Sequence, residues 1–252
     1  MTKVLICGIG GHMGANVYAL VSEEPDAEVV CGVDLHAPEA IKVPVYASFS
    51  DVKEDVDVVI DFSSPAVLKS ELAWATEKKV PLVLATTGYT EDDLKAIDEA
   101  SKKTAVFRTA NFSLGINLLV KLVKEAASVL GEAFDIEIIE KHHNQKKDAP
   151  SGTALMLADS INEVYGGTKE YMNGREGQVG KRGSEIGIHA VRGGTIVGEH
   201  EVMFAGEDEI ITLSHSARSK KVFAAGAVKA AVWMAGKPAG KYDMNDLLKD
   251  VL

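Results

Sequence analysis

The chain has 252 residues, of which 46% are hydrophobic, and a formal net charge of −10 at pH 7. This length can bury a sizeable core as one large or two modest domains, and the acidic balance argues against nucleic acid as a partner. The start MTKVLICGIGG becomes glycine-rich too early for a secretory signal, and no apolar run approaches membrane-spanning length. We therefore expect a cytoplasmic protein without a membrane partner.

The first half of the chain alternates short apolar runs with helical stretches. Strands are expected over KVLICG, AEVVCGVD, VDVVIDFS and PLVLATT, and helices over MGANVYALVSEE, VLKSELAWATEKK and TEDDLKAIDEASKK. Thr90 followed by Asp93 is a variant of the capping pattern at the start of the third helix. Cys7 and Cys31 lie in apolar strand-like runs, which favours buried small hydrophobes over a disulfide, a metal pair or a nucleophile. The alternation predicts an α/β parallel sheet with helices on both faces.

The pattern changes after TAVFRTANFS. A helix is expected over GINLLVKLVKEAASVL, followed by a strand over FDIEIIE and, after an intervening segment, a helical run ALMLADSINEV. SEIGIHAVRG, TIVGEHEVMFAG and DEIITLSHSA then alternate like half-buried strands, which suggests an antiparallel or mixed sheet with one covered face. KVFAAGAVKAAVWMAGK reads as a helix whose small residues would allow close packing against another element. We expect two domains, with the C-terminal helices returning to the first.

A glycine-rich loop joins the first strand to the first helix. It reads GIGGHMG from Gly8 to Gly14, with the third glycine one residue later than in the usual dinucleotide fingerprint. Asp34 ends the second strand twenty residues after Gly14, where a carboxylate can accept ribose hydroxyls. The alternative is a tight turn closed by glycines. Together, the strand, loop, helix and acid favour a site for a dinucleotide pyrophosphate.

The segment KHHNQKKDAPSGTA, Lys141 to Ala154, concentrates groups that could handle an anionic substrate. Alternation in IEIIEKHH sends His142 and His143 to opposite sides, so one could donate a proton while the other binds. Lys146 supplies a cation, and the helix that follows Pro150-Ser151-Gly152-Thr153 presents backbone amides that favour a carboxylate.

Other interpretations of these histidines and lysines stay open. A solvated loop would explain the charge run, and a zinc site from His142, His143 and a remote carboxylate is conceivable, although no HExxH or cysteine-rich spacing supports it. We expect no metal. His189 and His215 lie in alternating strands and are expected to be packed or surface groups.

EKHHNQKKDAPSGTA strongly resembles the signature of the dihydrodipicolinate reductase family. GIGGHMG, VVIDFSSP, ATTGY, ANFSLGIN and IVGEHEVMFAG resemble that family's other landmarks in the same order, so the likeness covers nearly the whole chain. It implies a doubly wound, Rossmann-like dinucleotide-binding domain over residues 1–113 and 217–252. The implied second domain, residues 114–216, is α+β with an open mixed sheet that binds substrate and builds a homotetramer.

The resemblance also implies residue roles. The implied reaction reduces 4-hydroxy-tetrahydrodipicolinate, a cyclic dicarboxylate of lysine and diaminopimelate biosynthesis, with hydride from NADH or NADPH and a proton from His142. Lys146 is placed with His142 in catalysis and is also implied to contact a substrate carboxylate. Substrate contacts are implied at His143, Ser151, Gly152, Thr153 and Thr87, and cofactor contacts at Gly8, Ile9, Gly10, Gly11, His12, Met13, Asp34, Ala85, Thr86, Thr87, Thr109, Ala110, Asn111 and Phe112.

The chain departs from its relatives where arginines are often found, at His12, Leu35, Ser64 and Lys220. Asp34 would repel a 2′-phosphate, so we expect NADH to serve at least as well as NADPH. Two alternatives are another amino-acid-pathway dehydrogenase and a nucleotide sensor that has lost turnover. The placement of both cysteines in N-terminal strands excludes a semialdehyde dehydrogenase with a cysteine nucleophile, and a sensor would need no acid beside a cation.

Overall fold

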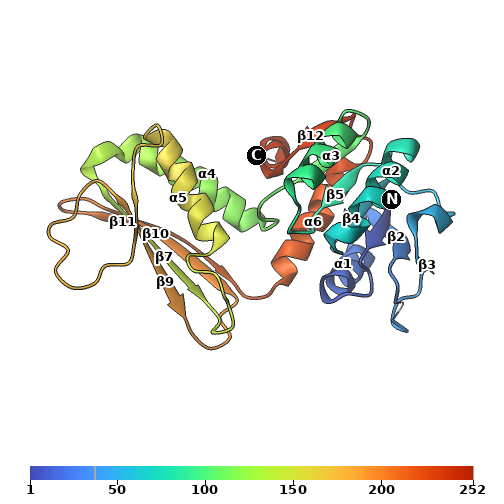
Figure 1. Ribbon diagram of the computed structural model, residues 1–252, viewed down its shortest axis with the longest axis horizontal. Helices are drawn as coiled ribbons and strands as arrows, with labels where there is room; N and C mark the ends of the chain where they lie inside the picture. Colours follow the sequence, from blue (N-terminus) through green and yellow to red (C-terminus); the bar gives the residue numbers. More distant parts are fainter. Residues whose placement is uncertain (37, 252) are drawn as a thin grey trace. The chain divides into compact units, whose positions relative to one another are not determined.

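A computed structural model describes residues 1–36 and 38–251. The chain divides into two compact units (Figure 1): unit 1 comprises Met1–Ser113 with Lys221–Leu252, and unit 2 comprises Leu114–Lys220. The first crossing lies where the sequence placed it, after residue 113. The return to unit 1 begins at Lys221 rather than at residue 217, because the last strand of unit 2 runs to Ala217.

Unit 1 is built on a seven-stranded sheet in which every neighbouring pair is parallel. The strand order is β12-β6-β5-β4-β1-β2-β3, which reverses direction at β1 and so gives the doubly wound arrangement predicted from the sequence. The strands are β1 (Thr2–Cys7), β2 (Ala27–Val33), β3 (Val45–Tyr46), β4 (Val58–Asp61), β5 (Leu82–Leu84), β6 (Ala105–Arg108) and β12 (Gly240–Tyr242).

Helices cover both faces of this sheet. They are α1 (His12–Glu23), α2 (Leu68–Lys78), α3 (Glu91–Ser101), α6 (Lys221–Met234) and α7 (Met244–Val251), with short 3-10 turns at Phe49–Asp51 and Pro65–Val67. Leu5 and Cys7 belong to the core formed with α2 and α3, so alternation turns Val4 and Ile6 toward the opposite face, where α1 packs on α6. β1 is therefore apolar on both sides, as a central parallel strand must be.

Unit 2 is a five-stranded mixed sheet in the order β11-β10-β7-β9-β8. Its strands are β7 (Asp135–His142), β8 (Tyr171–Asn173), β9 (Ile186–Arg192), β10 (Gly198–Ala205) and β11 (Ile210–Ala217). β10 pairs antiparallel with β7 and β11, whereas β9 pairs parallel with β7 and β8. Burial alternates residue by residue along β7 and β10, so the period-two pattern correctly predicted one covered face.

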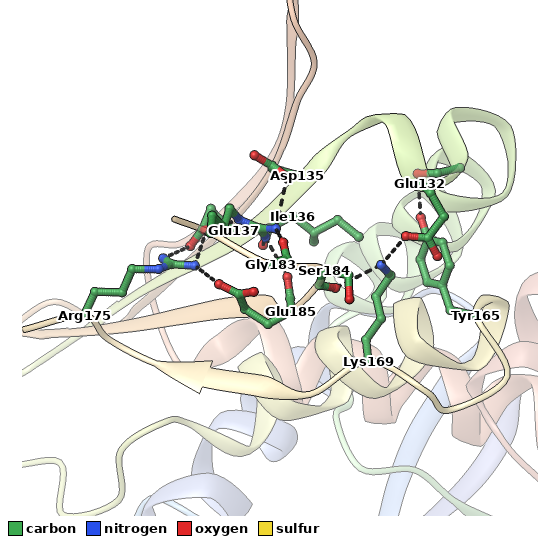
Figure 2. A network of polar contacts seen from close by, with 12 residues as sticks. Glu132, Asp135, Ile136, Glu137, Tyr165, Lys169, Arg175, Gly183, Ser184 and Glu185 are labelled. Atoms are coloured by element: carbon green, nitrogen blue, oxygen red, sulfur yellow. Dashed lines mark hydrogen bonds and ion pairs between the residues drawn. The ribbon is translucent and has the colours of Figure 1, made fainter. Parts of the chain in front are cut away.

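Two helices, α4 (Leu114–Leu130) and α5 (Gly152–Val164), cover that face (Figure 1), and a 3-10 turn at Gly131–Ala133 follows α4. Even-numbered side chains such as Ile138 and Val202 join Leu119 and Leu157 of the helices in one core. Odd-numbered residues of β7 point to the other face, where Glu137 accepts hydrogen bonds from Arg175 and Arg182. Figure 2 shows Glu137 and Glu185 around Arg175, which ties the segment before β9 to the sheet.

Several local predictions are confirmed. Thr90 and Asp93 form a reciprocal capping box at α3. Cys7 and Cys31 are buried free thiols. Gly226 of α6 allows the expected close packing, since a Cβ there would lie 1.7 Å from the Phe112 carbonyl oxygen. No helix among residues 1–36 and 38–251 is long and apolar enough to cross a membrane.

Candidate active site

The glycine loop of unit 1 is a tight strand-to-helix turn that only glycine permits at two positions. Gly8 has φ +80°, and its carbonyl accepts the Gly11 amide at 3.0 Å. Gly14 lies in the first turn of α1, where a Cβ would be 2.0 Å from the Gly8 carbonyl oxygen. The displaced third glycine therefore lets the helix approach the strand closely.

Asp34 follows β2 and faces the same loop. Its carboxylate accepts the Gly10 amide at 2.9 Å and the His36 amide at 3.0 Å, which fixes its position beside the turn. Gly8, Gly11 and Asp34 line a cavity of about 480 Å³. Ser64 and the exposed Leu35 also line it, and its described lining contains no lysine or arginine.

The remaining predicted cofactor residues of unit 1 lie in the β1–α1 turn or follow β5 and β6. The Ala85 amide donates to the Asp61 carbonyl at 2.9 Å, and the Thr86 hydroxyl accepts the Ser63 amide at 2.9 Å. In the turn after β1, Ile9 is buried, and His12 and Met13 open α1. In the loops after β5 and β6, Thr87 and Ala110 are exposed, and Thr109, Asn111 and Phe112 belong to the turn after β6.

In unit 2, His142 is the last residue of β7 and lies on its buried side. Its Nδ1 atom is 2.6 Å from Oε2 of Glu140, a side chain with no exposed surface. Glu140 also accepts hydrogen bonds from both terminal nitrogens of Arg192, each at 2.7 Å, and from the Ser151 amide at 2.9 Å. A histidine, a carboxylate and an arginine are thus joined where the predicted catalytic segment begins.

Ser151 is the N-cap of α5. Its hydroxyl accepts the Ala154 amide at 3.1 Å and lies 3.0 Å from Nε2 of His200, whose ring is 5.2 Å from that of His142. Because Ser151 is only 2% exposed and its amide already donates to Glu140, it supports the site from within the fold. Gly152 is exposed and Thr153 half-buried in the first turn of the helix.

Lys146 and His143 lie in the segment between β7 and α5. The Lys146 ammonium is 2.9 Å from a carboxylate oxygen of Asp148, and this hydrogen bond lowers the pKa of Asp148. His143 is half-buried, and its buried Nδ1 has no hydrogen-bond partner among the described residues. The segment therefore holds a cation and an imidazole close to His142 along the chain.

Two family models cover almost the whole chain. "Dihydrodipicolinate reductase, N-terminus" matches residues 2–112, and "Dihydrodipicolinate reductase, C-terminus" matches residues 115–248. The chain belongs to the dihydrodipicolinate reductase family. It is therefore an oxidoreductase that binds a nicotinamide dinucleotide, which confirms the predicted enzyme class.

Curated and solved relatives agree with this family. The 4-hydroxy-tetrahydrodipicolinate reductase of Caldanaerobacter subterraneus is 54% identical over 99% of both chains. That of Clostridium tetani is 47% identical over 98% of this chain and 97% of the relative. The dipicolinate-bound dihydrodipicolinate reductase from Paenisporosarcina sp. TG-14 has a TM-score of 0.82 at 27% identity, covering 97% of this chain and 99% of that one. The predicted function as a reductase of the lysine and diaminopimelate pathway is confirmed at the level of the family.

Sequence reasoning missed Glu140, Arg192 and His200. Glu140 is two residues before His142, so the period of a strand places both side chains on one face, and this signal was available. Arg192 and His200 are distant in sequence and reach the site through strand register, in which His142 pairs with Arg192 and Glu140 pairs with His200.

The other two histidines behave as predicted, as packed groups of the sheet. His189 lies on β9 with Nε2 2.7 Å from Glu137, and His215 is half-buried on β11, where burial lowers its pKa. Among the described residues, no group of three or more histidine, cysteine, aspartate or glutamate side chains is arranged to hold a metal ion.

Proposed function

We propose that this reductase converts 4-hydroxy-tetrahydrodipicolinate to tetrahydrodipicolinate with His142 as the proton donor. The observation that carries the proposal is the contact between His142 Nδ1 and the buried Glu140 carboxylate, which favours a charged imidazole able to release a proton from Nε2. A bound reduced nicotinamide would supply the hydride.

The cofactor would be held by the glycine loop and by Asp34 of unit 1. The missing Cβ atoms of Gly8 and Gly14 are what allow a backbone cradle there, and the start of α1 favours the negative charge of a pyrophosphate. Ile9, Gly10, Gly11, His12 and Met13 complete this loop, and residues 85–87 and 109–112 would contribute from the neighbouring strand ends.

For the substrate we propose carboxylate contacts from His143, Lys146, Gly152 and Thr153. Lys146 would exchange its partner Asp148, which is 58% exposed as a side chain, for a substrate carboxylate. The start of α5 adds amides that favour an anion. Ser151 and Thr87 were predicted to bind substrate as well, and the buried Ser151 would act by holding the start of α5.

The dipicolinate named for the Paenisporosarcina relative suggests that the chain recognises a cyclic dicarboxylate. Dipicolinate should therefore compete with substrate, and titration calorimetry with NADH present should detect its binding. Lys146→Ala should weaken that binding. No heat of binding at millimolar dipicolinate would count against the assignment of these carboxylate contacts.

We propose a homotetramer built through the face of the unit 2 sheet that α4 and α5 leave uncovered. Val191 is 45% exposed on β9 and Ile210 is 62% exposed on β11, which leaves apolar surface for a second copy. Light scattering should give about four times the chain mass of 26.9 kDa. A strict monomer would mean that this face needs no partner.

The function is tested by steady-state oxidation of NADH and NADPH, with and without the product of dihydrodipicolinate synthase. Oxidation should require that product, and His142→Ala should lower kcat by about 10²–10⁴-fold with a smaller change in KM, because a general acid acts in the transition state. Near-normal turnover by the variant would move the proton donor elsewhere.

A further inference from the structure

Glu140 is a carboxylate enclosed by donors at the end of β7. Its Oε2 is 2.6 Å from His142 Nδ1 and 2.7 Å from Nη1 of Arg192. Its Oε1 accepts Nη2 of Arg192 at 2.7 Å and the Ser151 amide at 2.9 Å. These contacts come from three separate elements, namely β7 itself, β9 and the start of α5. A side chain that only filled space would not need this set.

The enclosed carboxylate is ionised. Burial raises the pKa of Glu140, but the hydrogen bonds from Arg192, His142 and the Ser151 amide outweigh it, and the net pKa lies below the ordinary value. An ionised carboxylate only accepts hydrogen bonds, so Nδ1 of His142 must carry a proton and donate it. The other ring nitrogen, Nε2, is the one that points away from Glu140.

Gly198 leaves space beside that second nitrogen. It begins β10, and a Cβ at this position would lie 3.1 Å from Nε2 of His142. That is tighter than ordinary van der Waals contact, so any larger residue would press against Nε2. Glycine at 198 and the carboxylate at 140 thus act on opposite nitrogens of one ring.

We propose that Glu140 is the positioning residue of the reductase, which holds His142 with Nδ1 protonated and Nε2 free to exchange a proton. This rests on the proposed role of His142 as the acid. Arg192 and the Ser151 amide keep Glu140 ionised, and the carboxylate stabilises the charged imidazole. After a proton leaves Nε2, the neutral ring keeps its bond from Nδ1 to Glu140.

Other ionisable groups face the pair from each neighbouring element. Arg192 comes from β9, and His200 and His215 from β10 and β11, while Lys146 and Asp148 follow β7 in the chain. Burial, reinforced by the positive charge of His142, lowers the pKa of His200 to about 4. His200 therefore stays neutral at working pH, and Glu140 is the negative charge that touches His142.

Glu137 provides a matched control on the opposite face of the same strand. It too accepts from arginines, Arg175 and Arg182 at 3.0 Å, and lies 2.7 Å from a histidine, His189. Figure 2 shows part of this cluster, in which Arg175 lies between Glu137 and Glu185. Glu137→Gln removes the same charge from a similar cluster that does not contact His142.

The test compares the pH profiles of kcat for wild type, Glu140→Gln, Glu140→Asp and Glu137→Gln. Glu140→Gln should lower kcat by about 10–100-fold, as for other partners that orient a histidine, with KM changed less than about threefold. Its alkaline limb should move to lower pH, because the charged imidazole has lost its carboxylate. Glu140→Asp should recover part of the rate. Glu137→Gln should leave kcat within about twofold of wild type and the alkaline limb of the profile at the same pH.

A readout independent of turnover is the ¹⁵N spectrum of His142 in the free protein. In wild type the neutral ring should carry its proton on Nδ1, and in Glu140→Gln it should shift toward Nε2, because the amide can donate to Nδ1. Unchanged tautomer and unchanged pH limb in a folded Glu140→Gln protein would overturn the proposal. If His142→Ala keeps its rate, the proposed acid is wrong; if only Glu140→Gln keeps it, the positioning role alone fails.

Discussion

Two glutamates with no exposed surface, one in each unit, have pKa values shifted in opposite directions. Glu140 in unit 2 is surrounded by Arg192, His142 and the Ser151 amide, and its pKa lies below the ordinary value even though burial opposes this. Glu71 on α2 of unit 1 has neither oxygen hydrogen-bonded within the described part of the chain. Burial, with the nearby Asp61 adding to it, raises the pKa of Glu71 well above its ordinary value.

The difference shows that burial alone does not decide whether a carboxylate is charged. Desolvation disfavours the ionised form of both side chains, and only donors with favourable geometry reverse that preference. Glu140 has an arginine that approaches through two parallel hydrogen bonds, whereas no cation among the described residues is paired with Glu71. We therefore expect Glu140 to stabilise the fold as an anion and Glu71 to be a neutral acid that destabilises unit 1 as pH rises.

The largest expected effect is from Arg192→Met, which removes the cation and leaves Glu140 enclosed. Breaking a buried pair in this way typically costs about 3–5 kcal/mol. Glu140 has a depressed pKa in the folded protein, so its stabilisation exists above the unfolded value and is lost as pH falls through the folded one. The loss caused by Arg192→Met should therefore be greatest near neutral pH and smaller in acid.

Hydrogen exchange is the appropriate measurement, because both tryptophans, Trp74 and Trp233, belong to unit 1. The amides of β7 and β9 should lose protection in Arg192→Met, while those of β1 and β4 should not. Equal protection of β7 in wild type and variant would show that Glu140 does not depend on its arginine.

A smaller effect of opposite sign is expected from Glu71→Met. It removes a buried acid with unpaired oxygens, and such a group typically costs about 1–3 kcal/mol. The folded pKa of Glu71 is raised, so its contribution to stability is fully present below the unfolded value near pH 4.3 and is lost as pH rises. The gain from Glu71→Met should therefore be larger at about pH 8 than at about pH 5.

Denaturant titrations followed by tryptophan fluorescence report on unit 1 and suit this comparison. Glu71→Gln is the control, since it removes the titration but keeps a polar group in the core. It should flatten the alkaline loss of stability without the full gain of methionine. A drop in stability on Glu71→Met at about pH 8 would mean that the carboxylate has a stabilising partner after all.

A third carboxylate, Asp34, extends the comparison to a partly exposed site. It is held by two backbone amides, and the described lining of its cavity has no lysine or arginine to accommodate a 2′-phosphate. We expect kcat/KM for NADH to be at least equal to that for NADPH at about pH 7.5, because the Asp34 carboxylate would repel a 2′-phosphate. Asp34→Ala should shift the ratio toward NADPH, whereas a preference for NADPH of about tenfold or more in wild type, equivalent to about 1.4 kcal/mol, would contradict this reading.

The smallest expected effect concerns a carboxylate at the surface. Asp93 accepts the amide and hydroxyl of Thr90, and these hydrogen bonds lower the pKa of Asp93 although desolvation opposes them. Thr90→Ala removes the N-cap of α3 and should destabilise unit 1 by about 1 kcal/mol in the same fluorescence titration. If the free energy of unfolding does not change, the capping box adds nothing to the stability that α3 already gains from its core contacts with α2.

Much of the fold could be predicted from patterns that are visible in the sequence. Alternation of apolar strands and capped helices predicted the parallel sheet, and period two predicted the mixed sheet with its covered face. The elements that were missed are mostly β3, β8 and β12, of two or three residues each, which are too short to show a period. Their positions depend on neighbouring strands rather than on their own residues.

The candidate site, too, could be predicted from the sequence only in part. The contiguous segment from His142 to Thr153 could be predicted, whereas Arg192 and His200 meet Glu140 only because β9 and β10 flank β7 in a particular register. The opposite pKa shifts of Glu71 and Glu140 could not be predicted from the sequence either, since both glutamates lie in apolar stretches of the chain. What separates them is the presence of donors from distant parts of the chain.

The most direct test of the account is a double-mutant cycle between Glu140→Gln and His142→Ala, measured as kcat for reduction of the synthase product by NADH. If Glu140 acts through His142, its loss should lower kcat by about 10–100-fold in the wild-type background and should have almost no further effect once His142 is absent. If the two losses multiply in the double variant, Glu140 acts independently of His142, and the account of a carboxylate that positions the proton donor is wrong.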